Sequence, residues 1–197
     1  MTKKYEMTSD TRKLIDGREV HRIKALRDFG KVKRGDVGGW IEKEENLSHE
    51  GNCWIFDHMT VCGNAQVSDD AKLNGYGMIS NDAVIRDNAH VNNLIIGGKS
   101  YIGGDVSLSS RCIICDDARI LKASDIMVFN NHFAGPTGLA FYRCADGSVK
   151  VSSFKFSGTI DGYINHILKN YKLDRHIKMY TDPIAMAQRY FGLEVTL

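Results

Sequence analysis

The most constraining feature of the sequence is a six-residue period that runs from Gly51 to Val128. An aliphatic residue occupies the same place in each hexad, and a mostly small residue stands two places before it. The aliphatic places are Ile55, Val61, Val67, Leu73, Ile79, Ile85, Val91, Ile96, Ile102, Leu108, Ile114, Ile120 and Ile126. A hexapeptide period is typical of a parallel β-helix, in which six residues form one flat face of a triangular coil. Three hexads close a coil, so the thirteen places predict a little over four coils.

The period is not perfect. Val91 and Ile96 are five residues apart instead of six, and glycine pairs follow at 97–98 and 103–104. These departures predict an irregular coil near residues 92–98. Elsewhere we expect the aliphatic side chains inside the coil, with Asn, Asp and Gly supplying the turns between faces.

The sequence before and after the repeat shows other patterns of secondary structure. Short alternating runs around Asp16–Gly17 predict a hairpin, and a second Asp-Gly turn at 145–148 predicts another. Helical spacing follows Thr159, and Asp182–Pro183 predicts the start of a last helix. We therefore expect a mainly β chain with these parts: an N-terminal β cap at 1–50, the β-helix at 51–128, a Gly/Pro/Asn linker at 129–138 and a C-terminal α/β domain at 139–197.

Composition excludes several classes of protein. The chain has 197 residues, a formal net charge of +2 and no apolar run of 18 or more residues. No membrane-spanning helix is expected, and the start lacks the apolar core of a signal peptide, which predicts a protein of the host-cell cytoplasm. The acidity of the coil follows from the aspartates at its turns, so nucleic acid is not favoured as a partner.

The five cysteines do not indicate disulfides or metal. Cys53 and Cys112 occupy the small place of the hexad, and Cys112-Ile-Ile-Cys115 is a product of the period. One of these two sulfurs should point inward and the other toward a corner. We expect reduced structural thiols, no bound metal and no cofactor.

Three blocks of the sequence resemble uncharacterised hexapeptide-repeat proteins of phages and prophages. The blocks are Ile23–Gly30 with Lys33–Ser48, then Glu50–Ile55 with its GNAQVS-type repeats, and Phe141–Arg143 with Phe156–Asp161. The resemblance implies a left-handed parallel β-helix with an N-terminal β cap and a small C-terminal α/β domain. It implies no catalytic residue.

Left-handed β-helices include acyltransferases that use a histidine as general base at the cleft between two subunits. Here His58 and His90 fall at outward, variable places of the hexad, as solvent-exposed side chains do. The repeats also lack the long loop excursion that shapes the acceptor site of such enzymes. A carbonic anhydrase would need three histidine ligands for zinc, and the coil offers two. The sequence therefore predicts that the chain is not an enzyme.

A binding role remains. Cations and aromatics alternate in the C-terminal part, and the predicted contact residues are Tyr142, Arg143, Lys150 and Lys155. Such groups suit a host protein or a small phosphate-bearing ligand. We predict a stoichiometric inhibitor of host defence that binds an effector protein or sequesters a signalling nucleotide. The alternatives are a trimeric scaffold, virion-associated or used in assembly, and a hexapeptide-repeat acyltransferase. The flat faces of a short β-helix also predict a homotrimer.

Overall fold

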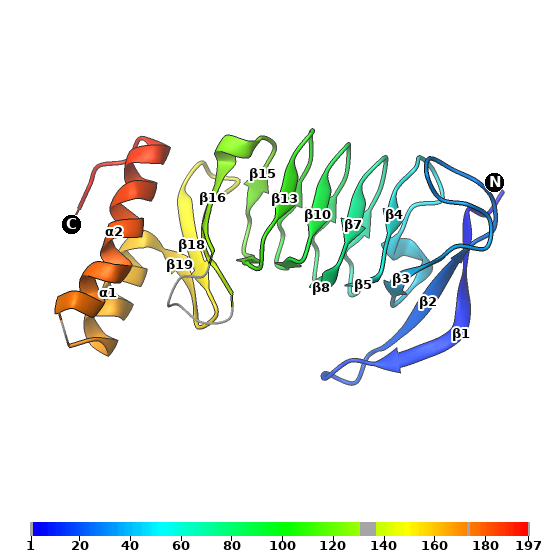
Figure 1. The fold of residues 1–197 in the computed structure, drawn as a ribbon, viewed down its shortest axis with the longest axis horizontal. Coiled ribbons are helices and arrows are strands. Elements are labelled where there is room, and N and C mark those ends of the chain that lie inside the picture. Colours follow the sequence, from blue (N-terminus) through cyan, green and yellow to red (C-terminus); the bar gives the residue numbers. More distant parts are fainter. Residues whose placement is uncertain (1, 131–136, 173, 197) are drawn as a thin grey trace.

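The computed structural model describes the whole chain except residues 1, 131–136, 173 and 197. The molecule is a rod (Figure 1). A β-hairpin lies at one end, the coils follow along the rod, and two helices lie at the other end. Most of the predicted linker, residues 131–136, falls outside the described part.

Three sheets run along the rod, one for each face of the coil, and within each the strands of successive coils pair in parallel. Sheet I contains β1 (Tyr5–Lys13), β2 (Glu19–Ala25), β3 (Val37–Ile41), β5 (His58–Val61), β8 (Tyr76–Ile79), β11 (Ile95–Ile96) and β14 (Ile113–Ile114). Sheet II contains β4 (Trp54–Ile55), β7 (Lys72–Asn74), β10 (His90–Asn92) and β13 (Ser107–Ser109). Sheet III contains β6 (Gln66–Val67), β9 (Val84–Ile85), β12 (Tyr101–Ile102) and β15 (Arg119–Ile120).

The core of the rod is the row of aliphatic residues that the period identifies. All thirteen are buried, and all but two have an exposed fraction of 1% or less. The two exceptions are Leu108 at 8% and Ile126 at 9%, both near the C-terminal end of the β-helix. The prediction of a mainly β fold built on a parallel β-helix of about four turns is therefore confirmed, and the arrangement fits a left-handed β-helix.

Corners between faces need backbone in the left-handed region, which few residues other than Gly, Asn and Asp adopt. The non-glycine residues there are Asp57, Asp69, Asn81, Asp87, Asn93 and Asp116, with φ between 53° and 62°. Every one is Asn or Asp, so the acidity of the coil does reflect its turns.

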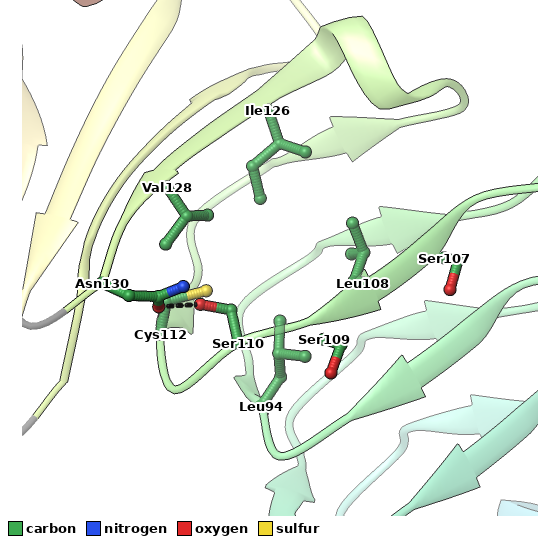
Figure 2. A pocket seen from close by; sticks show the side chains of 9 residues that line it. All are labelled: Leu94, Ser107, Leu108, Ser109, Ser110, Cys112, Ile126, Val128 and Asn130. Atoms are coloured by element: carbon green, nitrogen blue, oxygen red, sulfur yellow. Dashed lines mark hydrogen bonds between the residues drawn. The ribbon is translucent and has the colours of Figure 1, made fainter.

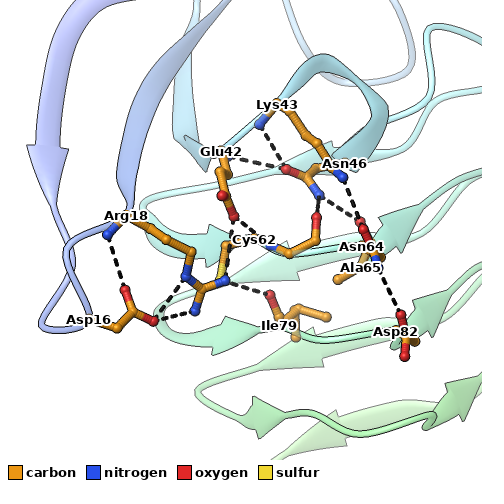
Figure 3. A network of polar contacts seen from close by, with 11 residues as sticks. Asp16, Arg18, Glu42, Lys43, Asn46, Cys62, Asn64, Ala65, Ile79 and Asp82 are labelled. Carbon is orange, nitrogen blue, oxygen red and sulfur yellow. Dashed lines mark hydrogen bonds and ion pairs between the residues drawn. The ribbon is translucent and has the colours of Figure 1, made fainter.

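The N-terminal hairpin continues sheet I. β1 and β2 pair antiparallel, β2 pairs antiparallel with β3, and β3 then pairs parallel with β5 of the second coil. A polar network fastens this hairpin to the coils (Figure 3). Arg18 contacts Asp16 at 2.9 Å and Glu42 at 3.4 Å, and Glu42 accepts a hydrogen bond from the backbone of Gly63 at 2.6 Å.

The first and last coils each contain a short 3₁₀ turn with a buried polar residue in its third position: η1 (Glu44–Asn46) and η2 (Ala123–Asp125). Asn46 Oδ1 accepts from the backbone of Glu42 and Lys43, and its amide donates to Gly63 and Ala65 of the next coil (Figure 3). Asp125 Oδ2 accepts from the two equivalent backbone N–H groups of its own turn. The same local structure therefore occurs at both ends of the stack of coils.

A fourth, antiparallel sheet covers the far end of the rod. It contains β16 (Ile126–Phe129), β17 (Leu139–Arg143), β18 (Val149–Ser153) and β19 (Phe156–Thr159), and the helices α1 (Ile160–Asn170) and α2 (Asp174–Phe191) pack on it. Backbone N–H groups of Gly138 and Ala145 donate to carbonyls of Arg111 and Asp117 in the last coil. The sheet is therefore hydrogen-bonded to the end of the β-helix.

Helix α2 begins eight residues before the predicted start at Asp182 and contains Pro183 in its interior. The reason is the apolar spacing: Ile177, Tyr180, Ile184, Ala187 and Phe191 all lie in or against the second core. These residues are spaced three and four apart, so the apolar face of the helix continues past Pro183. No helix in the described part of the chain is long and apolar enough to span a membrane.

Candidate functional site

The slip in the hexapeptide period shortens one corner of the middle coil. Between sheets II and I, the corner after Val91 has one residue fewer than the corners after Leu73 and Leu108 in the neighbouring coils. A shorter corner lies closer to the axis of the rod than the corners on either side of it. The predicted irregularity therefore becomes a depression in the surface.

The backbone is closely packed at the shortened corner. The carbonyl oxygen of Leu94 lies 2.0 Å from the position that a Cβ at Gly77 would occupy, so this place of the preceding coil admits only glycine. Asn93 adopts the left-handed conformation, and its Oδ1 accepts a hydrogen bond from the backbone of Tyr76 at 2.9 Å. The side chain of Asn93 thus replaces a backbone bond lost through the slip.

The depression is a groove of about 430 Å³, which we call the slip groove. It is lined by Tyr76, Gly77, Asn93, Ile95, Arg111, Cys112 and Thr137. Tyr76 is 68% exposed and Ile95 40%, which is unusual for large apolar side chains on a single face. Arg111 is exposed on the coil above and forms no ion pair with the described residues. The groove therefore combines apolar lining side chains, Tyr76 and Ile95, with an arginine that has no ion-pair partner among the described residues.

A second cavity of about 170 Å³, the end cavity, shares Cys112 with the slip groove. In Figure 2 the side chains of Ile126 and Val128 extend from β16 toward Leu94, Leu108 and Cys112. Ser110 and Asn130 are hydrogen-bonded to each other at its edge. Burial raises the pKa of the Cys112 thiol to about 12, so this sulfur is neutral at physiological pH.

His58 is the histidine nearest to this groove on sheet I. It is exposed and stacks on Tyr76, its partner in the β5–β8 ladder, with ring centroids 4.6 Å apart and planes 14° apart. His58, whose imidazole can accept a proton, therefore lies beside a residue that lines the groove. His90 lies on sheet II between Lys72 and Ser107, and it does not line the slip groove.

The structure places three of the four predicted contact residues where the C-terminal sheet meets the coil. Tyr142 is fully buried, with its hydroxyl 3.3 Å from Cys115 Sγ. Arg143 contacts the Phe191 carbonyl at 3.3 Å and lies 4.0 Å from Asp125, while Lys150 pairs with Asp117 at 2.8 Å. Lys155 is exposed and separate from them. Their role in binding stays a prediction, but the first three already have partners within the chain.

The cysteines are all free thiols. Cys112 is buried and Cys115 only half-buried, so the two sulfurs of the CxxC sequence do differ in environment. No group of three His, Cys, Asp or Glu side chains gathers as a metal site in the described residues.

The sequence alone did not point to Tyr76, Ile95 or Arg111 as functional candidates. The one available signal was the slip between Val91 and Ile96, which predicted an irregular coil but not that the irregularity forms a groove. The groove depends on residues from three successive coils, and their side chains meet only when the register of the stack is known.

Comparison with known proteins gives an informative similarity. Over 75 residues, 38% of this chain, the sequence is 35% identical to the protein of Escherichia coli (strain K12) named Uncharacterized acetyltransferase YdcK. The matched part is 23% of that protein, so the chain spans less than a quarter of the length of this relative. No protein-family profile matches the chain.

This similarity corrects two predictions. The sequence suggested a non-enzymatic inhibitor of host defence, and therefore no enzyme, but the relative is named an acetyltransferase. Both predictions are wrong on this finding, which favours the acyltransferase alternative. The error came from treating the outward position of His58 as evidence of a solvent-exposed side chain without a role, although a general base at a subunit cleft is also exposed within a single chain.

Proposed function

We propose that this chain is an acyltransferase of the hexapeptide-repeat type, which transfers an acyl group from a thioester donor to an amine or hydroxyl acceptor. The observation that carries the proposal is the position of His58 on sheet I, stacked on the Tyr76 ring at the edge of the slip groove. The similarity to an acetyltransferase and the β-helix itself support the same class of reaction.

In this proposal His58 is the general base. Its ring takes the proton from the acceptor N–H or O–H as that atom attacks the thioester carbonyl, and then returns a proton to the departing thiolate. The C–S bond breaks as the new C–N or C–O bond forms, so no oxidant or further reactant is needed. The apolar lining of the slip groove, Tyr76 and Ile95, would hold the thioester arm and exclude water.

The proposal includes a homotrimer, because β-helix proteins of this type commonly form trimers and a cleft between chains would enclose His58. Sheet I is the candidate subunit face, since Met78, Ile95 and Ile113 form a ladder along it. Light scattering should give about three times the 22.0 kDa mass of the chain. A single 22 kDa species at micromolar concentration would reject the trimer.

The activity is tested by following release of free thiol from acetyl-CoA in the presence of a panel of amines and amino sugars. Wild-type protein should release thiol in an acceptor-dependent way. Replacement His58→Gln should lower kcat by at least about 100-fold, the usual contribution of a general base, without raising KM for the donor.

The matched control is His90→Gln, which removes the other exposed histidine of the coil from a different face. It should keep wild-type kcat. Equal rates for the two variants would remove His58 from the mechanism. No thiol release by the wild-type protein with any acceptor would contradict the proposed function itself.

A further inference from the structure

Two arginines lie against one tryptophan where the N-terminal hairpin meets the first coil. The Arg12 guanidinium is 4.5 Å from the centre of the Trp40 ring, and that of Arg22 is 5.0 Å from it. Neither arginine forms an ion pair with the described residues. Two positive charges are therefore held close together without a carboxylate between them.

The register of sheet I explains why these side chains meet. Arg22 is directly opposite Trp40 in the β2–β3 pair, and Arg12 is opposite Val20, two residues before Arg22 on the same side of β2. All three side chains therefore project from one face of the sheet. That face continues from Trp40 to Thr60, Met78, Ile95 and Ile113, each opposite the previous one in the next coil.

The site contains hydrogen-bond donors that find no acceptor. Trp40 is only 7% exposed, and its indole Nε1 is buried without a partner among the described residues. The Nε atom of Arg12 is also buried without a hydrogen-bond partner among the described residues, although the Nη2 atom donates to Thr60 Oγ1. Burial, and next the charge of Arg22, lower the pKa of Arg12. A buried donor without an acceptor is costly, so an acceptor atom from outside the chain would stabilise this site.

Two acidic side chains of this region, Glu42 and Glu19, have other partners. Glu42, two residues after Trp40, accepts from Arg18 and from the backbone of Gly63 (Figure 3). Glu19 lies 3.8 Å from His21. The ladder from Arg22 to Ile113 contains no carboxylate at all. None of these side chains supplies the missing acceptor.

We propose that Arg12, Arg22 and Trp40 form a binding site for a phosphate group. A phosphate carries close to two negative charges and several acceptor oxygens, which match two guanidinium groups and an indole N–H, whereas a carboxylate would neutralise only one charge. The phosphate can belong to a nucleotide-tailed thioester such as coenzyme A, or be free inorganic phosphate. This proposal does not depend on acyl transfer.

The position on sheet I connects the site with the slip groove. β3 and β11 are three strands apart in the sheet, which at about 4.8 Å for each step is roughly 14 Å. An extended thioester donor with its phosphate on Arg12 and Arg22 could therefore run along this face to Ile95. The phosphate site would then select the donor by its tail and not by its acyl group.

The test measures binding of inorganic phosphate, adenosine 3′,5′-bisphosphate and coenzyme A by titration calorimetry and by tryptophan fluorescence at low salt. The chain has two tryptophans, so Trp54→Phe leaves Trp40 as the single reporter. Replacements Arg12→Gln and Arg22→Gln should each weaken binding at least tenfold. Arg22→Lys keeps the charge and should lose less, and circular dichroism checks that every variant is folded.

The matched control is Lys13→Gln, which removes a neighbouring cation that lies opposite Glu19 in the β1–β2 register. Alternation along β1 places Lys13 on the opposite side from Arg12, so its loss should change affinity less than twofold. Tighter binding of the bisphosphate and coenzyme A than of inorganic phosphate would identify the nucleotide tail as the source. Equal affinities would identify the free anion, and both results support the phosphate site.

The proposal is overturned if none of the three probes binds the wild-type protein, or if the arginine variants bind as tightly as wild type. It is also overturned if these variants change only the oligomeric state, because a partner subunit would then supply the acceptor. Phosphate binding without any acyl transfer would refute the proposed function and leave this site intact. In an active protein, the arginine variants should raise KM for the donor at unchanged kcat.

Discussion

Replacement Asn46→Asp tests how the first coil is fastened to the second. The change preserves the shape of the side chain but replaces the amide donor with a carboxylate oxygen. In the wild-type protein this amide donates to the carbonyls of Gly63 at 3.1 Å and Ala65 at 2.8 Å, and the residue is fully buried. The variant places a negative oxygen against two carbonyl oxygens, with no solvent to separate them.

The expected cost follows from these contacts. Two lost hydrogen bonds cost about 0.5–1.5 kcal/mol each, and leaving buried acceptors unpaired adds about 1–3 kcal/mol more. We expect the free energy of unfolding to fall by about 3–5 kcal/mol at pH 7, which for a chain of this size lowers Tm by roughly 10 °C. Urea unfolding followed by circular dichroism measures it.

The pH dependence of this variant has a defined sign. Repulsion by the carbonyls raises the pKa of the new carboxyl in the folded protein above its unfolded value of about 3.9. The stability deficit is then smallest below about pH 4, where the carboxyl is protonated and can donate, and grows as the pH rises through the folded pKa.

The control is Asp125→Asn in the equivalent turn of the last coil. Asp125 accepts from the backbone of Leu121 and Lys122, as an asparagine oxygen can, and loses only its charge toward Arg143 at 4.0 Å. We expect a change of about 1 kcal/mol or less. Equal destabilisation of the two variants, or a deficit for Asn46→Asp that grows at acid pH, would refute the reasoning.

Three further predictions concern the core, one buried amine and the thiols. Val67→Asp or Ile85→Asp should abolish soluble expression, because an unpaired charge cannot be buried inside the coil, and a normal yield of either variant would contradict the packing. Burial lowers the pKa of Lys4, so the unfolded chain binds more protons between the folded and unfolded pKa values, and stability rises with pH there. The stability of wild type relative to Lys4→Met, measured by urea unfolding, should therefore increase as the pH rises toward the unfolded pKa of about 10.4, and a constant difference would argue against it. A thiol reagent should modify Cys115 rapidly in the folded protein and the four buried cysteines only on unfolding; rapid loss of a second thiol would show that the coil opens.

The architecture of the coil was predictable because its determinant is local and repeated. Each hexad carries its own inward aliphatic residue, as at Ile79 or Ile114, and its own turn residues, so one period predicts the whole stack. The start of α2 was harder to predict from the sequence. Pro183 and its preceding aspartate form a typical helix start, but burial of Ile177 and Tyr180 against the second core overrides this local signal.

The candidate site was much less predictable than the fold. Tyr76, Ile95 and Arg111 are far apart in sequence and occupy ordinary outward places, and only stacking of the coils brings them to one groove. Arg12 and Trp40 meet because β1, β2 and β3 pair antiparallel with one another and extend sheet I beyond the coils. The hexapeptide period carries no information about this pairing. Lys150 shows the converse, since its alternation with aromatics suggested a ligand and its partner is Asp117 of the coil.

The hydrogen bonds between the C-terminal sheet and the last coil also bear on polymerisation. A parallel coil whose terminal strands are free is a template for another chain, and such edges seed filaments. Here Gly138 and Ala145 donate to the carbonyls of Arg111 and Asp117, and Ser152 donates to that of Ile113. Removal of residues 138–197 would remove the donors to these carbonyls while the hairpin still blocks the other end. The truncated rods should then assemble head to head in pairs and not into long fibres.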